Sequence, residues 1–457
     1  MTDYAISLNP TTGEELARYP FETDAALDQA LARSAATFAE WRYRPVEERA
    51  AMLVRLGAAL RRNSAAMARM ITLEMGKPSV QARAEIEKCA ALCEWYAEHG
   101  PALLAPEPTQ VAKAFIQYRA LGPVLAVMPW NFPVWQVLRG AVPILLAGNS
   151  YVLKHAPNVM GCAALMLQAF EEAEAPRGLF EVINVTPARV STAIADPRIA
   201  AVAVTGSVRA GSAIAAQAGA ALKKCVLELG GADPFIVLAD ADLEQAVKAA
   251  IVGRFQNSGQ VCVAAKRIIV EAPLLEAFTE RFLEGVRALK VGDPLLDENY
   301  VGPMARYDLR DELHGQVQQS IGQGARLLLG GDKLPGAGNY YAPTVLADVV
   351  PGMTAFDQEL FGPVASIIAA RDAEHALQLA NDSEFGLAST VWSADVERAR
   401  RIAARLETGG VFINGYCASD PRVAIGGIKK SGYGRELSHF GLREFCNAQT
   451  VWEDRLG

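Results

Sequence analysis

Apolar residues in the N-terminal part of the chain recur with helical spacing. Leu53 and Leu56 lie three positions apart within one such pattern, and Thr23 stands where a side chain can cap the start of an earlier helix. A further helical pattern begins at Ser79. The sequence therefore predicts three helices within residues 23 to 99.

From about residue 123 the pattern changes to short apolar runs that alternate with helical stretches. Each run is long enough for a strand and too short for a helix. Such alternation favours a doubly wound parallel sheet. The predicted strands are PVLAVM, SYVLK, FEVINV, IAAVAVTG and KKCVLEL, with helices at 158 to 174, 187 to 195 and 207 to 220.

A second alternating series follows the first. Its predicted strands are PFIVLAD (234 to 240), RIIVE, ARLLLGG, PVASIIAA, STVWS and GVFIN. Two series predict an α/β protein with two doubly wound domains and a ligand cleft between them. Residues 111 to 119 and 447 to 455 fit neither core, so we expect them to be edge strands that pair with a partner chain.

The composition is that of a globular protein without a polyanionic partner. Apolar residues make up 51% and charged residues 21% of the chain, the net charge is −7, and no stretch concentrates Lys and Arg. We therefore expect neither nucleic acid nor an anionic membrane as a partner. The N-terminus lacks the features of a secretory signal, and Pro and Gly interrupt every long apolar run. These features predict a soluble, cytoplasmic protein.

The cysteines and histidines do not form a disulfide or metal pattern. Seven cysteines are scattered along the chain without a C-x-x-C spacing, which is typical of reduced thiols. The five histidines are far apart and none belongs to an H-E-x-x-H helix, so we expect no metal centre.

One cysteine stands in a loop that is suited to chemistry. In FQNSGQVCVAAKR (255 to 267), Cys262 follows the small and polar run NSGQ. An unpaired cysteine is most often a small buried hydrophobic residue. A loop that lets backbone approach a ligand closely favours a nucleophile instead. Taken alone, the residue leaves both roles open.

Two further residues have a polar side chain where a strand ends. Glu228, in VLELGG, is either bonded to backbone or directed into a cleft, where burial would raise its pKa toward that of a general base. Asn131, in MPWNFPVWQ, could donate to an oxyanion or form a turn hydrogen bond.

Two more features are consistent with a phosphate-bearing ligand. VTGSVRAG (204 to 211) ends a strand and starts a helix, so the amides of Gly206 and Ser207 could face a phosphate. Lys154 closes a neighbouring strand, where its ammonium could reach a ribose or a phosphate. A solvated lysine and an ordinary helix start are the alternatives.

The order of these features along the chain resembles that of the NAD(P)-dependent aldehyde dehydrogenase superfamily. An Asn flanked by proline, a Lys at the next strand end, a Gly-Ser helix start, Glu-Leu-Gly-Gly and Gly-Gln-x-Cys follow one another. The similarity continues through ELFGPV (359 to 364), NDSEFGLAS (381 to 389) and GGIKKSGYGRE (426 to 436), and thus covers nearly the whole chain.

The resemblance implies a role for each matching residue. Cys262 would be the nucleophile, Glu228 the general base, and Asn131 with the backbone N–H of Cys262 the oxyanion hole. The implied reaction oxidises an aldehyde through a thiohemiacetal and a thioester, without a metal. The residues implied to hold NAD or NADP are Trp130, Lys154 at the adenosine ribose, Gly206 and Ser207 at the pyrophosphate, Glu359 at the nicotinamide ribose and Phe361 against the nicotinamide.

The resemblance also implies how the chain is divided and assembled. A Rossmann-like NAD(P)-binding domain would comprise residues 1–110 and 125–228, and a catalytic domain residues 229–425. Residues 111–124 and 440–457 would be oligomerisation strands of a homodimer or homotetramer.

The choice of aldehyde depends first on Arg139. It interrupts an apolar, helix-like run, and a buried guanidinium needs an anion. That anion is either a structural Asp or Glu, or the carboxylate of a substrate. Succinate-semialdehyde dehydrogenases of this family have an arginine at this distance from the oxyanion asparagine and a serine at the position of Ser419, and the sequence resembles them there.

The match to those enzymes is incomplete. Many of them have a second arginine six positions before the nucleophile, where this chain has Gln256. Arg422 could replace the missing cation, and Asp420 could orient its loop or Arg422 itself. The resemblance to shorter bacterial relatives that also have glutamine predicts succinate semialdehyde as the substrate. Another aliphatic, aromatic or carboxylated aldehyde is the alternative.

The cofactor expectation depends on Pro157, three residues beyond Lys154. NAD-preferring relatives often have a glutamate there, whose charge repels the 2′-phosphate of NADP. Proline neither grips the ribose nor excludes the phosphate, so we expect both cofactors to be used, with NAD weakly favoured. A CoA-acylating enzyme and a catalytically silent binding protein are less consistent with the presence of Glu228 and Cys262.

Overall fold

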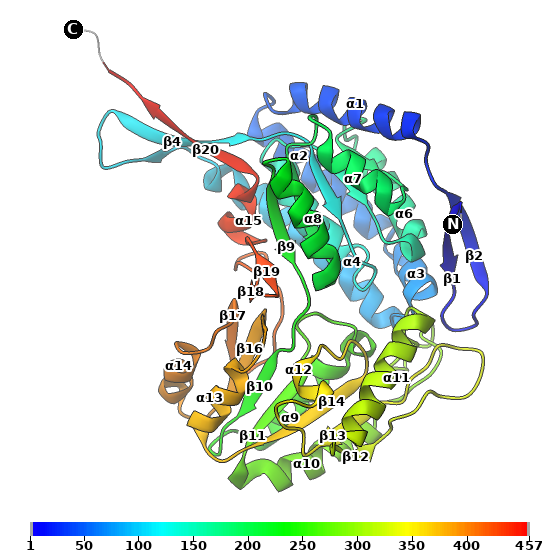
Figure 1. Ribbon diagram of the computed structural model, residues 1–457. Helices are drawn as coiled ribbons and strands as arrows, with labels where there is room; N and C mark the ends of the chain where they lie inside the picture. Colours follow the sequence, from blue (N-terminus) through cyan, green and yellow to red (C-terminus); the bar gives the residue numbers. More distant parts are fainter. Residues whose placement is uncertain (1–2, 455–457) are drawn as a thin grey trace.

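Two mainly parallel sheets, each with a hydrophobic core on both faces, form the body of the computed structural model (Figure 1). The structure describes residues 3 to 454. A separate three-stranded antiparallel sheet, an N-terminal hairpin and the short antiparallel pair of β15 (Phe385–Gly386) and β18 (Ile428–Lys429) complete the described part. The predicted α/β class with two doubly wound domains is confirmed.

The first sheet contains the strands predicted between residues 123 and 229. Its order is β19-β9-β8-β5-β6-β7, and every neighbouring pair is parallel except β19 and β9. The antiparallel strand comes from the C-terminal part of the chain and was not predicted. The strands are β5 (Val124–Val127), β6 (Tyr151–Lys154), β7 (Phe180–Val182), β8 (Ala201–Thr205), β9 (Lys224–Glu228) and β19 (Gly432–Tyr433).

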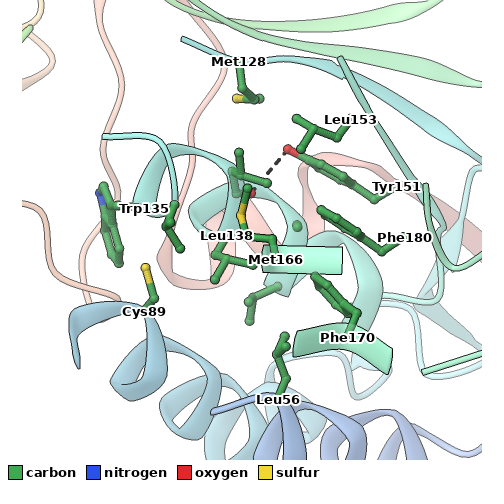
Figure 2. Packing of buried hydrophobic residues seen from close by; sticks show 14 of the residues in the cluster. Leu56, Cys89, Met128, Trp135, Leu138, Tyr151, Leu153, Met166, Phe170 and Phe180 are labelled. Atoms are coloured by element: carbon green, nitrogen blue, oxygen red, sulfur yellow. Dashed lines mark hydrogen bonds between the residues drawn. The ribbon is translucent and has the colours of Figure 1, made fainter. Parts of the chain in front are cut away.

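Alternate side chains of this sheet enter different cores, because successive residues of a strand face opposite sides. Leu125 and Val152 belong to the core on one face, and Tyr151 and Leu153 to the core on the other. Figure 2 shows the second of these cores, where the ring of Phe180 stacks on Tyr151 at a centroid distance of 5.7 Å. The surrounding helices are α1 (Asp24–Trp41), α2 (Val46–Arg62), α3 (Ser64–Met75), α4 (Ser79–Leu103), α5 (Trp135–Leu146), α6 (Met160–Glu172), α7 (Pro187–Ala195) and α8 (Val208–Ala220).

The N-terminal region contains four helices where the sequence predicted three. The hydroxyl of Thr23 accepts the N–H of Ala26 at 3.2 Å, which confirms the predicted cap of α1. Only Asn63 separates α2 from α3, so the apolar pattern continues across the break, and Gly76 at φ +78° ends α3. The hairpin of β1 (Tyr4–Leu8) and β2 (Glu15–Pro20) was also not predicted.

The second sheet has seven strands in the order β12-β13-β14-β11-β10-β16-β17, parallel except for β12. Six of them match predicted strands, and β13 was missed. The strands are β10 (Pro234–Val237), β11 (Arg267–Glu271), β12 (Arg326–Leu329), β13 (Thr344–Ala347), β14 (Val364–Ala370), β16 (Ala388–Trp392) and β17 (Gly410–Ile413), and the helices are α9 (Leu243–Phe255), α10 (Ala272–Arg287), α11 (Tyr307–Gly322), α12 (Thr354–Asp357), α13 (Ala373–Asn381) and α14 (Val396–Ala403).

The two segments that fitted neither core pair with each other. They form the antiparallel sheet β20-β4-β3, which projects from the body (Figure 1). The strands are β3 (Glu107–Pro108), β4 (Ala114–Ala120) and β20 (Cys446–Trp452), and the short helix α15 (Ser438–Glu444) precedes β20. Residues 455 to 457 of the predicted C-terminal element lie outside the described residues.

Candidate active site

The predicted site residues of the first domain lie at one edge of its sheet. Chain order turns back between β5 and β8, and ligands of doubly wound sheets bind outside the carboxyl ends of strands at such a point. The structure brings to this edge Trp130 and Asn131 after β5, Lys154 at the end of β6, Gly206 and Ser207 after β8, and Glu228 at the end of β9.

A tightly held loop presents the cysteine. Asn257 and Ser258, both at φ 54°, lie in the short 3₁₀ turn η2 (Gln256–Gly259) just before Cys262. The side-chain amide of Asn257 donates to the backbone oxygen of Asn131 at 2.8 Å, and the hydroxyl of Ser258 donates to Gly302 at 2.9 Å. The left-handed backbone is therefore held by buried hydrogen bonds on both sides of the cleft.

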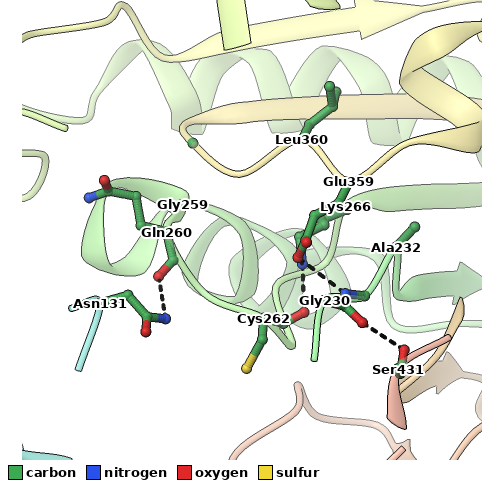
Figure 3. A network of polar contacts seen from close by, with 12 residues as sticks. Asn131, Gly230, Ala232, Gly259, Gln260, Cys262, Lys266, Glu359, Leu360 and Ser431 are labelled. Carbon is green, nitrogen blue, oxygen red and sulfur yellow. Dashed lines mark hydrogen bonds and ion pairs between the residues drawn. The ribbon is translucent and has the colours of Figure 1, made fainter. Parts of the chain in front are cut away.

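Asn131 lies against this loop. Its side-chain Nδ2 donates to the backbone oxygen of Gln260 at 3.0 Å (Figure 3). An amide nitrogen carries two hydrogens, so one N–H stays available for a second acceptor. The backbone N–H of Cys262 donates to no acceptor among the described residues. Asn131 and Cys262 thus supply the two donors that an oxyanion hole requires.

Burial keeps the cysteine in its thiol form at neutral pH. It raises the pKa of Cys262 to about 11, although the positive charges of Arg139 and Lys266 act in the opposite direction. The Lys266 ammonium donates to the backbone oxygen of Cys262 at 2.5 Å, and Figure 3 shows the sulfur directed away from that contact. A base must therefore remove the proton before the sulfur can attack.

Glu228 has the properties of such a base. Burial raises its pKa to about 8, partly offset by the charge of Arg139, and the nearby carboxylate of Glu436 raises it further. Its Oε1 atom is buried without a hydrogen-bond partner. A carboxylate with a pKa near 8 and one free oxygen is suited to accept a proton near neutral pH.

The residues expected at the adenosine side fit a dinucleotide, with one correction. Lys154 is largely buried, which lowers its pKa, and forms no ion pair within residues 3 to 454. The backbone N–H of Gly206, expected to face a phosphate, instead donates to the backbone oxygen of Glu228 at 3.0 Å, because β8 and β9 pair up to this point. Ser207 caps α8 with its hydroxyl, and its backbone N–H has no acceptor among the described residues.

The space beside this helix start is open. A Cβ atom added to Gly206 would meet nothing within 4 Å. An open surface next to the N-terminus of a helix and a lysine without a counter-ion provides the positive potential that a pyrophosphate needs.

Of the two residues of the second domain that were expected at the nicotinamide, Glu359 contacts its own domain and Phe361 contacts the first. Glu359 forms an ion pair with Lys266 at 2.9 Å and accepts the N–H of Gly231 at 3.1 Å. The ring of Phe361 meets the edge of Trp130 at a centroid distance of 5.8 Å. Phe361 of the second domain thus lies against the first at the predicted position of the nicotinamide.

Arg139 is paired inside the protein. Its guanidinium contacts the carboxylate of Glu436, and its Nη2 atom lies 3.9 Å from Oε2 of Glu228, with all three side chains at most 7% exposed. Of the two anions considered for Arg139, the structure supplies the internal carboxylate. The expectation that Arg139 meets the substrate carboxylate is therefore not supported by its contacts.

The loop after β17 differs from expectation in one respect. Arg422 forms a bidentate pair with Asp420 at 2.7 and 2.8 Å on the surface, and its side chain is 73% exposed. It is directed to its own loop and does not replace the missing cation, whereas Asp420 orients it as expected. Ser419 accepts a hydrogen bond at 2.7 Å from Lys88, which the sequence analysis had not considered. Gln256 starts η2 and is half-buried.

Three residues of the site were missed. Lys266 directly precedes the apolar strand β11, where a lysine is unusual, so its position was a usable signal. Glu436 stands at the end of GGIKKSGYGRE and drew attention only through that motif. Lys88 gave no signal, because Ser419 is 331 residues away along the chain.

Two other classes of site are absent from residues 3 to 454. No helix there is long and apolar enough to cross a membrane. No group of three His, Cys, Asp or Glu side chains in that range could hold a metal ion.

The sequence is similar to known enzymes over almost its full length. The model of the aldehyde dehydrogenase family matches residues 3–451. The chain is 65% identical to a succinate semialdehyde dehydrogenase [NAD(P)+] of Escherichia coli, covering 99% of this chain and 98% of the relative. It is 44% identical to a probable succinate-semialdehyde dehydrogenase [NADP(+)] of Synechocystis, over 98% and 99% of the two chains.

Solved structures are also similar over almost the full length of the chain. A succinic semialdehyde dehydrogenase from Streptococcus pyogenes in complex with NADP+ superimposes with a TM-score of 0.96 at 36% identity, covering 98% of this chain and all of that one. A succinate-semialdehyde dehydrogenase from Burkholderia pseudomallei gives a TM-score of 0.94 at 35% identity, covering 98% and 94%.

Proposed function

Since this chain belongs to the aldehyde dehydrogenase family, we propose that it oxidises succinate semialdehyde to succinate with NAD or NADP. The observation that carries the reaction type is the half-buried Cys262, whose loop accepts the amide N–H of Asn131 at Gln260 and whose thiol pKa is raised by the charge of Glu228. The names of the relatives support the choice of substrate.

The first step is attack by sulfur on the aldehyde carbon. Glu228 takes the proton of the Cys262 thiol, the new C–S bond forms, and the carbonyl π electrons move to the oxygen. The second N–H of Asn131 and the backbone N–H of Cys262 then stabilise the oxyanion. This sequence uses only groups whose hydrogen-bonding capacity is free in the structure.

NAD or NADP fits the open edge of the first sheet. Lys154 and the start of α8 at Ser207 would hold its adenosine and pyrophosphate, while Glu359, Phe361 and Trp130 would contact the nicotinamide half. When bound, the cofactor supplies the hydride acceptor of the reaction. Because the ring of Pro157 carries neither charge nor donor, it does not discriminate between NAD and NADP.

The last step releases the acid. Glu228 first passes the thiol proton to solvent and so becomes a carboxylate again. It then accepts a proton from water as the water oxygen bonds to the thioester carbon, the C–S bond breaks, and Cys262 leaves as a thiolate. The proton held by Glu228 can then return to the sulfur or to solvent. Glu228 and Asp233 each have a buried carboxylate oxygen without a hydrogen-bond partner, and both act on the pKa of Cys262.

Initial rates test the proposal directly. NADH and NADPH formation should be measured with succinate semialdehyde and with pentanal, which has a similar chain length but no charge. We expect kcat/KM for the semialdehyde to be higher by about 10-fold or more, which corresponds to one charge-assisted contact. Cys262→Ala should abolish the activity, whereas Cys225→Ala, a half-buried cysteine of β9, should retain it.

The internal pairing of Arg139 favours one second candidate. With its guanidinium occupied by Glu436, the cation predicted from the sequence is not free to select a carboxylated aldehyde. Oxidation of another aliphatic or aromatic aldehyde would then fit the same catalytic residues. Equal or better kcat/KM for pentanal would select this alternative.

Domain boundaries, assembly and location remain proposals of the same kind. We propose an NAD(P)-binding domain of residues 1–110 and 125–228, a catalytic domain of residues 229–425, and oligomerisation strands within 111–124 and 440–457. The projecting sheet β20-β4-β3 has β20 at a free edge, which supports a homodimer or homotetramer. Free cysteines at all seven positions fit a cytoplasmic location. Light scattering of the purified protein would measure the assembly.

A further inference from the structure

Lys88 and Ser419 form a polar pair between two distant parts of the chain. The Lys88 ammonium on α4 donates to the hydroxyl of Ser419 at 2.7 Å, in the loop that follows β17. The same ammonium lies 4.1 Å from the ring centre of Trp135, the first residue of α5. Helix α4, the start of α5 and the loop after β17 therefore meet at this nitrogen.

The charge of Lys88 has no counter-ion. An ammonium has three donors, and the hydroxyl of Ser419 is the sole acceptor that the described residues offer it. No carboxylate within residues 3 to 454 forms an ion pair with it, while the positive charge of Arg139 acts on it from α5. A half-buried cation next to a second cation is costly unless an anion joins them.

This cation belongs to the neighbourhood of the nucleophile. The charge of Arg139 influences both Lys88 and the thiol of Cys262. The thiol of Cys417, two residues before Ser419, is in turn influenced by Cys262 and Lys88. Trp135, beneath the ammonium, follows Asn131 by four residues. Lys88 and the thiol of Cys262 thus share Arg139 and Cys417 as neighbours.

Helix α4 holds Lys88 and the oxyanion region in a fixed relation. Glu85, three residues before Lys88, accepts the backbone N–H groups of Val134 and Trp135, each at 2.9 Å. Its carboxylate also pairs with the buried ammonium of Lys77. One face of a single helix therefore positions both the chain after Asn131 and the unpaired cation.

We propose that Lys88, together with the hydroxyl of Ser419, binds the carboxylate of the substrate and makes the enzyme select carboxylated aldehydes. Lys88 would supply the positive charge for the substrate carboxylate. Gln256 has no charge, Arg422 is paired with Asp420, and Arg139 is paired with Glu436. This inference rests on the proposed function, since it names the residues that recognise succinate semialdehyde.

The proposal has a pH signature. Burial lowers the pKa of Lys88 to about 8, with Arg139 acting in the same direction and Cys89, Glu85 and Asp420 in the opposite one. The ammonium is charged below this value and neutral above it. KM for succinate semialdehyde should therefore rise as the pH increases from about 7 to about 9, while KM for uncharged pentanal should not follow.

The test compares three variants with the wild type, using kcat and KM for succinate semialdehyde and for pentanal. Lys88→Met keeps the apolar stem on Trp135 and removes the charge, Lys88→Arg keeps the charge, and Lys248→Met is the control for an exposed lysine of α9. We expect Lys88→Met to lower kcat/KM for the semialdehyde by about 10-fold or more, mainly through KM, with pentanal unchanged within about 3-fold. Lys88→Arg should recover part of the loss, and Lys248→Met should match the wild type.

The outcomes separate this inference from the proposed function. If Lys88→Met lowers kcat/KM equally for both aldehydes, or does not lower it for the semialdehyde, the role of Lys88 is overturned. The proposed substrate of the enzyme would still stand. A wild type that oxidises pentanal as well as the semialdehyde would refute the proposed function itself. A pH-dependent KM that persists unchanged in Lys88→Met would assign the carboxylate contact to another group.

Discussion

The Nη2 atom of Arg139 lies 3.9 Å from Oε2 of Glu228, and both side chains are almost completely buried. Glu436 contacts the Nε atom of the same guanidinium. One positive charge therefore serves two carboxylates, one of which is the proposed general base. Because the charge of Arg139 acts against the burial that raises the pKa of Glu228, this arginine helps to set the pH at which the base ionises.

Replacing Arg139 by Met should affect the base and leave substrate selection intact. Without the guanidinium the pKa of Glu228 should rise, so the increase of kcat with pH should shift to higher pH for both aldehydes. Unpaired Glu436 should also cost about 3 to 5 kcal/mol of the free energy of unfolding. The measurements are pH–rate profiles with succinate semialdehyde and pentanal, and denaturant unfolding.

The matched control is the double variant Arg139→Met with Glu436→Gln. It removes the unpaired carboxylate, so part of the lost stability should return. The pH profile should also move part of the way back, because the charge of Glu436 raises the pKa of Glu228. If Arg139→Met lowers the rate only for the semialdehyde and leaves the pH profile unchanged, this role is contradicted. Arg139 would then be assigned to binding of the substrate carboxylate.

Glu228→Gln should remove the pH dependence that the base produces. In the wild type the base is formed as the pH rises through about 8, so the rate of thioester hydrolysis should rise with it. Glutamine cannot accept the proton, and the variant should be slower by about 100-fold or more near pH 8, with a flat profile. Stopped-flow measurement of NADH formation, which records both the burst and the later steady rate, would check this. A residual increase of either rate with a midpoint near pH 8 would assign the base elsewhere.

The fold could be predicted to the extent that its strands are buried on both faces. PFIVLAD and RIIVE are continuous apolar runs, as expected of strands that are covered on both faces. The first forms β10 and the second forms β11 of the second sheet. β13 escaped because TVLA is too short to stand out, and β19 because it is a two-residue pairing supplied from the C-terminal part. Short pairings depend on tertiary contacts that local pattern does not contain.

The site could be predicted where local sequence places a functional group at a strand end or in a loop. Asn131, Glu228 and Cys262 all belong to such positions, and the structure brings elements from both domains together around them. The partner of Arg139 could not be predicted, because Glu436 comes from a segment that returns to the first sheet after the second domain is complete. The same reason hid the contact of Lys88.

Gly206→Ala should weaken binding of the cofactor and leave the fold unchanged. A methyl group at this position meets no protein atom within 4 Å and would project into the open space beside the start of α8. We expect the Kd for NAD and for NADP to rise by about 10-fold, measured by calorimetry, with an unchanged Tm. Gly219→Ala, also without a neighbour within 4 Å but on the exposed side of α8, is the control and should bind both cofactors as the wild type does. Unchanged affinity in Gly206→Ala would place the pyrophosphate away from this turn.

His155 should make the fold sensitive to mild acid. It is 1% exposed, lies 2.9 Å from the backbone oxygen of Pro133, and burial lowers its pKa to about 4 from 6.5. The unfolded chain thus binds more protons than the native state between these values, so stability falls as the pH decreases through this window. The contribution of His155 to the free energy of unfolding should fall by about 2 kcal/mol as the pH decreases from about 7 to about 5. Urea unfolding of the wild type and of His155→Gln at both pH values isolates this contribution, because every other titrating group is shared. We expect the variant to lose less stability on acidification by that amount, and an equal loss in both proteins would show that His155 is already protonated in the native state.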